Sequence, residues 1–229
     1  MKKRLIFISI ILSLSAFSCS KKAENADNFL VPAISFESYS SGKITILNEN
    51  GLDSAKIRAF SGKNSHLHSI IAPLNEVKLE TYKGGQKYKS VRDGAIIKRF
   101  FQPQIEDGFQ ILSLVEVLKE LVYKFPVVDD FTKNYQLLKL TVQNFSKDNA
   151  EICVLSHIII LIKLLGYDFK NELNLTDDFE CLINELLSKR YKELLNFDYK
   201  NIKMSRLIVF FLEMIEKYSE TKIISKNLI

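Results

Sequence analysis

Short runs of alternating apolar and polar residues fill the chain up to about residue 100. In the segment KITIL, Ile44 and Ile46 share one face of an extended chain, and in EVKLETY the same holds for Val77 and Leu79. Such runs, rich in β-branched and aromatic residues and separated by turn residues, predict β-strands. The predicted strands are residues 33–40, 43–50, 54–62, 75–84 and 86–94. These five short strands indicate a small β-barrel.

A helical period replaces the alternation beyond Phe101, where glycine is almost absent. Apolar residues then recur three and four positions apart, which is the spacing of one helix face. The predicted helices are residues 109–125, 134–145, 150–169, 177–195 and 203–220. Because 150–169 is more apolar than the others, we expect it to be the central helix of a bundle, ended by Gly166. The sequence therefore predicts an α+β fold, with a five-stranded barrel over residues 32–99 and an all-helical domain over residues 100–229.

The first 19 residues, MKKRLIFISIILSLSAFSC, have the order of a bacterial secretory leader. Three basic residues are followed by an apolar stretch from Leu5 to Phe17 and by small residues around Cys19. This stretch is short for a transmembrane helix, and a cysteine at its end resembles the lipid-modified cysteine of lipoproteins. Residues 20–31 are polar and are predicted to form a tether. The alternative is a buried hydrophobic N-terminal helix, for which the rest of the chain supplies no polar face.

Positive charge concentrates in the predicted barrel. The formal net charge of the 229-residue chain is +5, and residues 42–100 contain eleven Lys and Arg against five Asp and Glu. Such an excess favours phosphate backbones or anionic surfaces as partners.

The basic and aromatic residues of the barrel are the candidate nucleic-acid contacts. The candidate phosphate contacts are Lys43, Lys56, Arg58, Lys63, Lys78, Lys87, Lys89 and Arg92. The candidate base-stacking residues are Tyr39, Phe60, Tyr82 and Tyr88. Small five-stranded barrels often bind oligonucleotides with such a combination of residues. Exposed lysines also protect sheet edges in proteins that bind no nucleic acid, so the pattern alone leaves both interpretations open.

Motifs of enzyme active sites are absent, including phosphate loops, dinucleotide fingerprints, HExxH and GxSxG. We therefore expect no catalytic residues, no cofactor and no metal. His66 and His68 could face one side of a strand, but no acidic residue or cysteine neighbours them, which favours a polar loop. His157 is predicted to be a hydrogen-bonded core residue, and Cys153 and Cys181 are predicted to be buried small apolar residues.

The order of these elements resembles the bacterial RecO family of recombination mediators. From Ala33 to Ile97, the segments ISFESYSSGKITILNENG, LDSAKIRAFSGKNSH and APLNEVKLETYKGGQKYKSVRDGAII are similar to that family's N-terminal oligonucleotide-binding (OB) domain. HIIILIKLLGYDFKNELNLTDDFECLI resembles the helix with a Leu-Gly-Tyr ending that precedes the family's cysteine-containing insert. The final MSRLIVFFLEMIEKYSETKIISKNLI resembles its closing helix.

The resemblance implies an OB barrel followed by a helical domain, in a protein that is not an enzyme. Members bind single- and double-stranded DNA, anneal complementary strands, and cooperate with RecR and the single-strand-binding protein to load RecA in DNA repair. Two positions depart from the family. Residues 61–64, Ser-Gly-Lys-Asn, replace a loop richer in arginine, and only Cys181 remains of a four-cysteine zinc site, so no zinc is expected.

The leader and the resemblance predict different compartments. DNA repair takes place in the cytoplasm, whereas a lipidated Cys19 would anchor the protein at the cell envelope membrane. The alternative to a RecO-type mediator is therefore an envelope lipoprotein that uses the barrel and helices as a binding or scaffold module. An envelope hydrolase without a local sequence motif is a third hypothesis. A processed and lipidated leader predicts a membrane-anchored location. An unprocessed leader predicts a cytoplasmic location.

If the leader is processed, the protein should incorporate radiolabelled palmitate in growing cells, because the Cys19 thiol would carry the lipid. Cys19→Ala should abolish the label, whereas Cys181→Ala should keep it. The measurement is autoradiography of the purified protein. An unlabelled wild-type protein would contradict the lipoprotein hypothesis.

Overall fold

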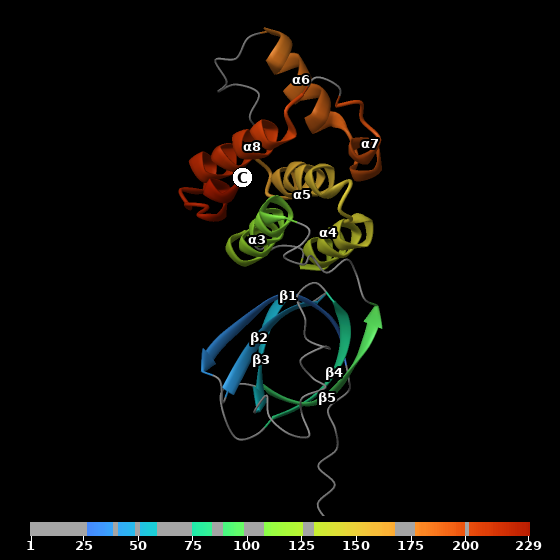
Figure 1. The fold of residues 1–229 in the computed structure, drawn as a ribbon, viewed down its shortest axis with the longest axis vertical. Helices are drawn as coiled ribbons and strands as arrows, with labels where there is room; N and C mark the ends of the chain where they lie inside the picture. The colour runs from blue at the N-terminus through green and yellow to red at the C-terminus, as the bar shows by residue number, and fades with distance from the viewer. Residues whose placement is uncertain are drawn as a thin grey trace, which may run out of the picture.

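The structure, a computed structural model, describes residues 27–38, 41–48, 51–58, 75–83, 89–98, 108–125, 131–167, 177–199 and 202–229. Strands precede helices along the chain (Figure 1), as the sequence predicts, so the fold is mixed α+β. The strands are β1 (Asp27–Ser38), β2 (Ser41–Asn48), β3 (Gly51–Arg58), β4 (Glu76–Lys83) and β5 (Lys89–Lys98). The helices are α3 (Phe109–Lys124), α4 (Phe131–Asn144), α5 (Ala150–Leu164), α6 (Asp177–Ser188), α7 (Tyr191–Leu195), α8 (Met204–Ser219) and the 3-10 helix η3 (Ser225–Leu228).

Hydrogen bonds link the strands in the order β1-β2-β3-β5-β4, and the pairing of β1 with β4 closes the sheet into a barrel. All pairings are antiparallel except that of β3 with β5. Ile46, Ala55, Val77, Leu79 and Val91 are buried. The alternation read from the sequence therefore separates buried from exposed positions, as in Val77, Lys78 and Leu79.

Strand β1 is longer than the sequence predicts. It begins at Asp27, so residues 27–31, assigned above to the polar tether, belong to the strand. Asp27 to Leu30 pair with β4, and the register shifts between Leu30 and Ala33, on either side of Pro32, which has no N–H to donate. The tether prediction was wrong here because strand pairing uses backbone groups, which polar side chains do not prevent.

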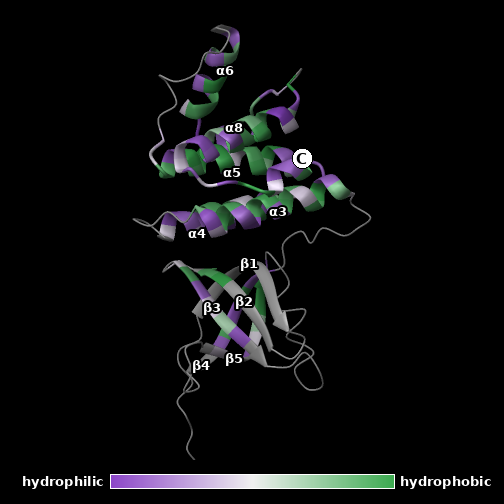
Figure 2. Cartoon of the chain, turned by 90° about the vertical axis from the view of Figure 1, so that its left-hand side faces the viewer, coloured by the Kyte–Doolittle hydropathy of each residue, from purple (hydrophilic) through white to green (hydrophobic). Residues whose placement is uncertain are grey.

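Helix α5 is the centre of the helical half, as the sequence predicts (Figure 2). Its residues are buried on nearly every side, and α3, α4, α6, α7 and α8 contact it. The helix ends in a Schellman motif, in which Gly166 has a φ of 72°. The Tyr167 N–H donates to the Ile162 carbonyl and the Gly166 N–H to that of Lys163, both at 3.2 Å.

The predicted helix over residues 177–195 is broken into α6 and α7. At the break, the Arg190 N–H donates to the Glu193 carboxylate at 2.6 Å, and the Lys163 ammonium of α5 donates to the Lys189 carbonyl. The break directs α7 back onto α5, where Tyr191 and Leu194 are buried. The amphipathic pattern of residues 177–195 is continuous and contains no Pro or Gly. The sequence therefore did not reveal this break, which tertiary contacts cause.

The barrel and the helices meet at a seam that is both apolar and charged. Leu47 of β2 is fully buried in the core of the helical half, and α4 contacts both β2 and β3. The Lys139 ammonium of α4 lies 2.5 Å from the buried Glu76 carboxylate of β4, and the Tyr135 hydroxyl donates to the same oxygen at 3.4 Å. The hydrogen bond with Glu76 raises the pKa of Lys139. This pairing gives a buried carboxylate the counter-charge that it requires.

His157 is buried inside the bundle, as predicted. The Thr141 hydroxyl donates a hydrogen bond to the Leu137 carbonyl at 2.9 Å. Its oxygen therefore accepts a hydrogen bond from His157 Nδ1–H, also at 2.9 Å. Burial without a counter-charge lowers the pKa of His157 to about 3. The imidazole is thus a neutral hydrogen-bond donor that links α5 to α4.

Protonation of His157 should make the helical half less stable in acid. In the unfolded chain the imidazole binds a proton below about pH 6.5, whereas in the folded chain it stays neutral down to about pH 3. Stability is therefore lost as the pH falls, by about 2 kcal/mol between pH 7 and pH 5. In His157→Gln, whose amide can donate to Thr141 but does not titrate, this loss should be absent. Urea unfolding at the two pH values measures the difference, and equal losses would contradict the assignment.

Candidate nucleic-acid interface

One end of the barrel faces away from the helices (Figure 1), and strand register places Lys43, Lys56, Arg58, Lys83 and Lys89 toward that end, whereas Lys98, opposite Glu76, lies at the end that meets the helices. The opposite end, which meets the helices, is marked by the pairs Leu47–Leu52 and Leu30–Glu76. The far end is marked by Ser41, which is opposite Arg58.

Lysine positions occupy neighbouring places on four adjacent strands at this far end. Lys43 of β2 is directly opposite Lys56 of β3, and Lys83 of β4 is directly opposite Lys89 of β5. The parallel pairing of β3 with β5 sets Ser90 opposite Lys56 and Lys89 opposite the buried Ala55, so the two lysine pairs lie at the same end of the barrel but on opposite faces of the sheet. We call these four lysines the basic row. With strands about 4.8 Å apart, the row spans roughly 15 Å of backbone.

The basic row brings four lysine positions together at one end of the barrel. Several positive charges on neighbouring strands create a local potential that attracts polyanions. The row is therefore the candidate phosphate contact of the barrel.

The candidate residues chosen from the sequence divide into three groups. Lys56 is half-buried within the row, whereas Lys78 is exposed. Lys78 lies five residues from Lys83, and Glu80 with its cross-strand neighbour Asp93 separates it from the row. For Lys43, Arg58, Tyr82, Lys89 and Arg92 the structure describes the backbone position in a strand. Outside the described residues lie Cys19, Tyr39, Phe60, Lys63, His66, His68, Lys87 and Tyr88.

Lys83 is a member of the row that sequence reasoning did not select. It lies at the end of the predicted strand over residues 75–84, directly before Gly84 and Gly85. The register shift between Glu80 and Thr81 brings Lys83 opposite Lys89. A bulge of this kind changes register without a sequence signal that we could recognise beforehand.

The helical half has a depression of about 530 Å³ where the first turns of α3 and α5 meet the start of α8. Gly108, Asn149 and Lys203 precede these helices, and none of them caps its helix with a side-chain hydrogen bond. Ile111, Leu114 and Met204 supply apolar lining, and Lys147, Asp148 and Glu151 supply charges of both signs. The Gln110 amide donates to Glu151 at 2.6 Å. No sequence pattern located this depression, because helix ends far apart in the chain form it.

The two cysteines that the structure describes are free thiols, one buried and one exposed. Cys153 is buried as predicted; burial raises the pKa of its thiol to about 11, and the thiol donates to the Asn144 carbonyl at 3.3 Å. The prediction that Cys181 is buried was wrong, because α6 turns mainly Ile183 and Leu186 toward the core and leaves Cys181 exposed. Among the described residues, no group of three or more His, Cys, Asp and Glu could hold a metal ion.

In the part of the chain that the structure describes, no helix combines the length and apolar character that crossing a bilayer requires. The fold defines the class of the molecule as an α+β protein in which a small barrel with a basic end is joined to a helical bundle. No protein-family model and no curated protein matches the chain. The candidate function therefore depends on the barrel, its charge and the sequence resemblance.

Proposed function

We propose that the chain is a non-enzymatic DNA-binding recombination mediator of the RecO type, whose barrel is an OB-type barrel. The strand order β1-β2-β3-β5-β4, with β3 parallel to β5, supports this assignment. OB barrels bind oligonucleotides on the face of strands 2 and 3, flanked by the loops between strands 1 and 2 and between strands 4 and 5. Here these loops, residues 39–40 and 84–88, follow the ends of β1 and β4 that border the basic row.

The basic row is the observation that carries the proposal. Lys43 and Lys56 lie on strands 2 and 3, and Lys83 and Lys89 flank the loop between strands 4 and 5. Their ammonium groups would neutralise successive phosphates of a DNA strand and release its counter-ions. Reduced repulsion between two phosphate backbones would then allow complementary strands to anneal. Binding of this kind involves no covalent step and little sequence preference.

The helical half would carry the protein partners. By the resemblance these are RecR and the single-strand-binding protein, whose tail is acidic and hydrophobic. The depression between α3, α5 and α8 suits such a tail, because three uncapped helix starts surround it and Ile111, Leu114 and Met204 line it. Lys147 would contribute a positive charge at its rim.

The alternative proposal is a lipid-anchored binding module of the cell envelope. Residues 1–19, with their basic start, apolar stretch and Cys19, favour it. In that setting the basic row would face an anionic surface or polymer of the envelope in place of DNA.

The purified protein should bind a single-stranded oligonucleotide with an affinity that falls steeply as salt rises, as measured by fluorescence anisotropy. The triple variant Lys43→Ala, Lys56→Ala, Lys89→Ala, which removes three members of the basic row, should weaken binding equally for all DNA sequences, because the lost contacts are to phosphates. Its salt slope on a log–log plot should be smaller by about 2, since each phosphate contact to single-stranded DNA contributes roughly 0.7.

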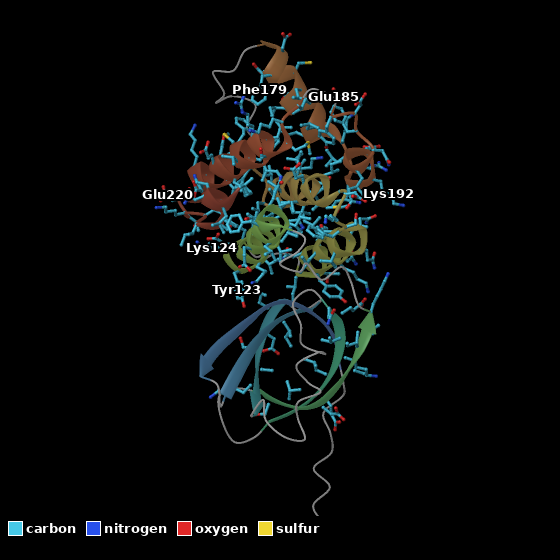
Figure 3. The ribbon with its side chains drawn as sticks, viewed as in Figure 1. Tyr123, Lys124, Phe179, Glu185, Lys192 and Glu220 are labelled. Atoms are coloured by element: carbon cyan, nitrogen blue, oxygen red, sulfur yellow. The ribbon has the colours of Figure 1, made fainter. Side chains whose placement is uncertain are left out.

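A matched control removes the same number of charges from the helical half. Lys192, which projects outward from α7 (Figure 3), and also Lys203 and Arg206 are exposed. The triple alanine variant of these residues should bind DNA like the wild type. Salt-insensitive binding, no binding, or equal losses in the two triple variants would each contradict the proposed interface.

A further inference from the structure

Exposed apolar side chains concentrate on one face of the helical half. Among the described residues, five large hydrophobic side chains are exposed, and four of them lie on α3 or on the C-terminal segment. These four are Phe109 (67% exposed), Ile224 (65%), Leu228 (42%) and Tyr123 (39%). Single exposed apolar residues are common, but a cluster of them marks an interaction surface.

Three of the four residues border one groove. Tyr123, Ile224 and Leu228 line a groove of about 340 Å³ together with Glu116, Lys119, Glu120 and Ser225. The groove is preformed, because the Glu120 carboxylate accepts hydrogen bonds from the backbone N–H groups of Ile224 at 2.9 Å and Ser225 at 2.7 Å. These bonds fix the C-terminal segment against the end of α3 at which Tyr123 lies (Figure 3).

The fourth residue, Phe109, lies on the same face of α3 as the groove. Phe109, Glu116 and Tyr123 are seven residues apart, which is two helical turns for each step. Phe109 is at the start of α3, and the groove is about 21 Å along the helix axis, beside Tyr123. One helix face therefore carries an exposed aromatic side chain at one end and an apolar groove at the other.

The edge of the groove nearer to Phe109 carries a pair of opposite charges, Glu116 and Lys119, which belong to its lining. Lys119 contacts the Glu116 carboxylate at 2.6 Å, and the Glu116 side chain is half exposed. If two copies of α3 lie antiparallel, Lys119 of each copy approaches Glu116 of the other. The charge pattern is thus complementary to itself.

We propose that this face is a homodimer interface, in which two copies of α3 pack antiparallel about a two-fold axis near Glu116. Phe109 of each copy occupies the groove of the other, beside its Tyr123, Ile224 and Leu228. A two-fold interface uses the same surface on both copies, so it buries both aromatic side chains and fills both grooves at once. A different protein would need to supply both a groove and an aromatic residue at the matching spacing.

If the barrel binds DNA as proposed above, the dimer has a consequence for that function. Each copy contributes a barrel with a basic row, so a dimer would hold two DNA strands in one complex. The tests below measure association without DNA, so their outcome is independent of the DNA-binding proposal.

Sedimentation velocity of the purified full-length protein over a wide concentration range should show a reversible dimer. Phe109→Ser should raise the dissociation constant at least roughly tenfold, because the side chain fills the groove of the second copy. Ile97→Ser, which removes the exposed apolar side chain of β5, is the matched control and should leave the dissociation constant unchanged. A wild-type protein that stays monomeric, or equal effects of the two substitutions, would overturn the proposal.

Charge reversal gives a second test that does not depend on the apolar contacts. Glu116→Lys alone makes all four charges about the two-fold axis positive, and Lys119→Glu alone makes all four negative, so each variant should be monomeric. Mixed in equal amounts, the two variants should form a heterodimer, and the double variant Glu116→Lys, Lys119→Glu should form a homodimer again. Because both side chains lie at the surface, the variants should fold, which circular dichroism checks. Failure of the mixture to associate would overturn the antiparallel arrangement.

Discussion

The enclosure of α5 is the constraint on which the helical half depends. Ten of its fifteen residues are buried, so no side of this helix can face water without a large loss of hydrophobic stabilisation. Helices α3, α4, α6, α7 and α8 all contact it. The break between α6 and α7 contributes to this enclosure, because it allows α7 to pack against α5 with Tyr191 and Leu194 buried. His157 is compatible with this enclosure as a neutral imidazole, because burial disfavours its charged form.

The position of α4 beside α5 in turn fixes where the barrel can attach. Leu47 enters the helical core, and Glu76 finds its counter-charge in Lys139. This seam occupies one end of the barrel and leaves the other end, with the basic row, away from the helices. The closed ladder of backbone hydrogen bonds holds the lysine positions of neighbouring strands close together. The proposed DNA contact would use this local concentration of positive charge.

The candidate interface could be predicted only in part from the sequence. The excess of Lys and Arg between residues 42 and 100 identified the barrel as the basic half. The row itself depends on the parallel register of β3 with β5, strands separated by about 30 residues of chain, and on a bulge in the pairing of β4 with β5. For these reasons Lys83 was not selected, and Lys78 was grouped with lysines that lie apart from it. The groove beside Tyr123 was equally hidden, since α3 and the C-terminal segment meet only in the folded chain.

Local periodicity and local backbone preference were enough to predict the order of strands and helices, the helices α3 and α8, the central place of α5 and its end at Gly166. In contrast, the start of β1, the break between α6 and α7, and the exposure of Cys181 depend on tertiary contacts. Strand pairing joins backbone groups whatever their side chains, and a helix breaks where packing against a neighbour gains more than one further turn would. Both effects depend on residues distant in the chain, and no local pattern records them.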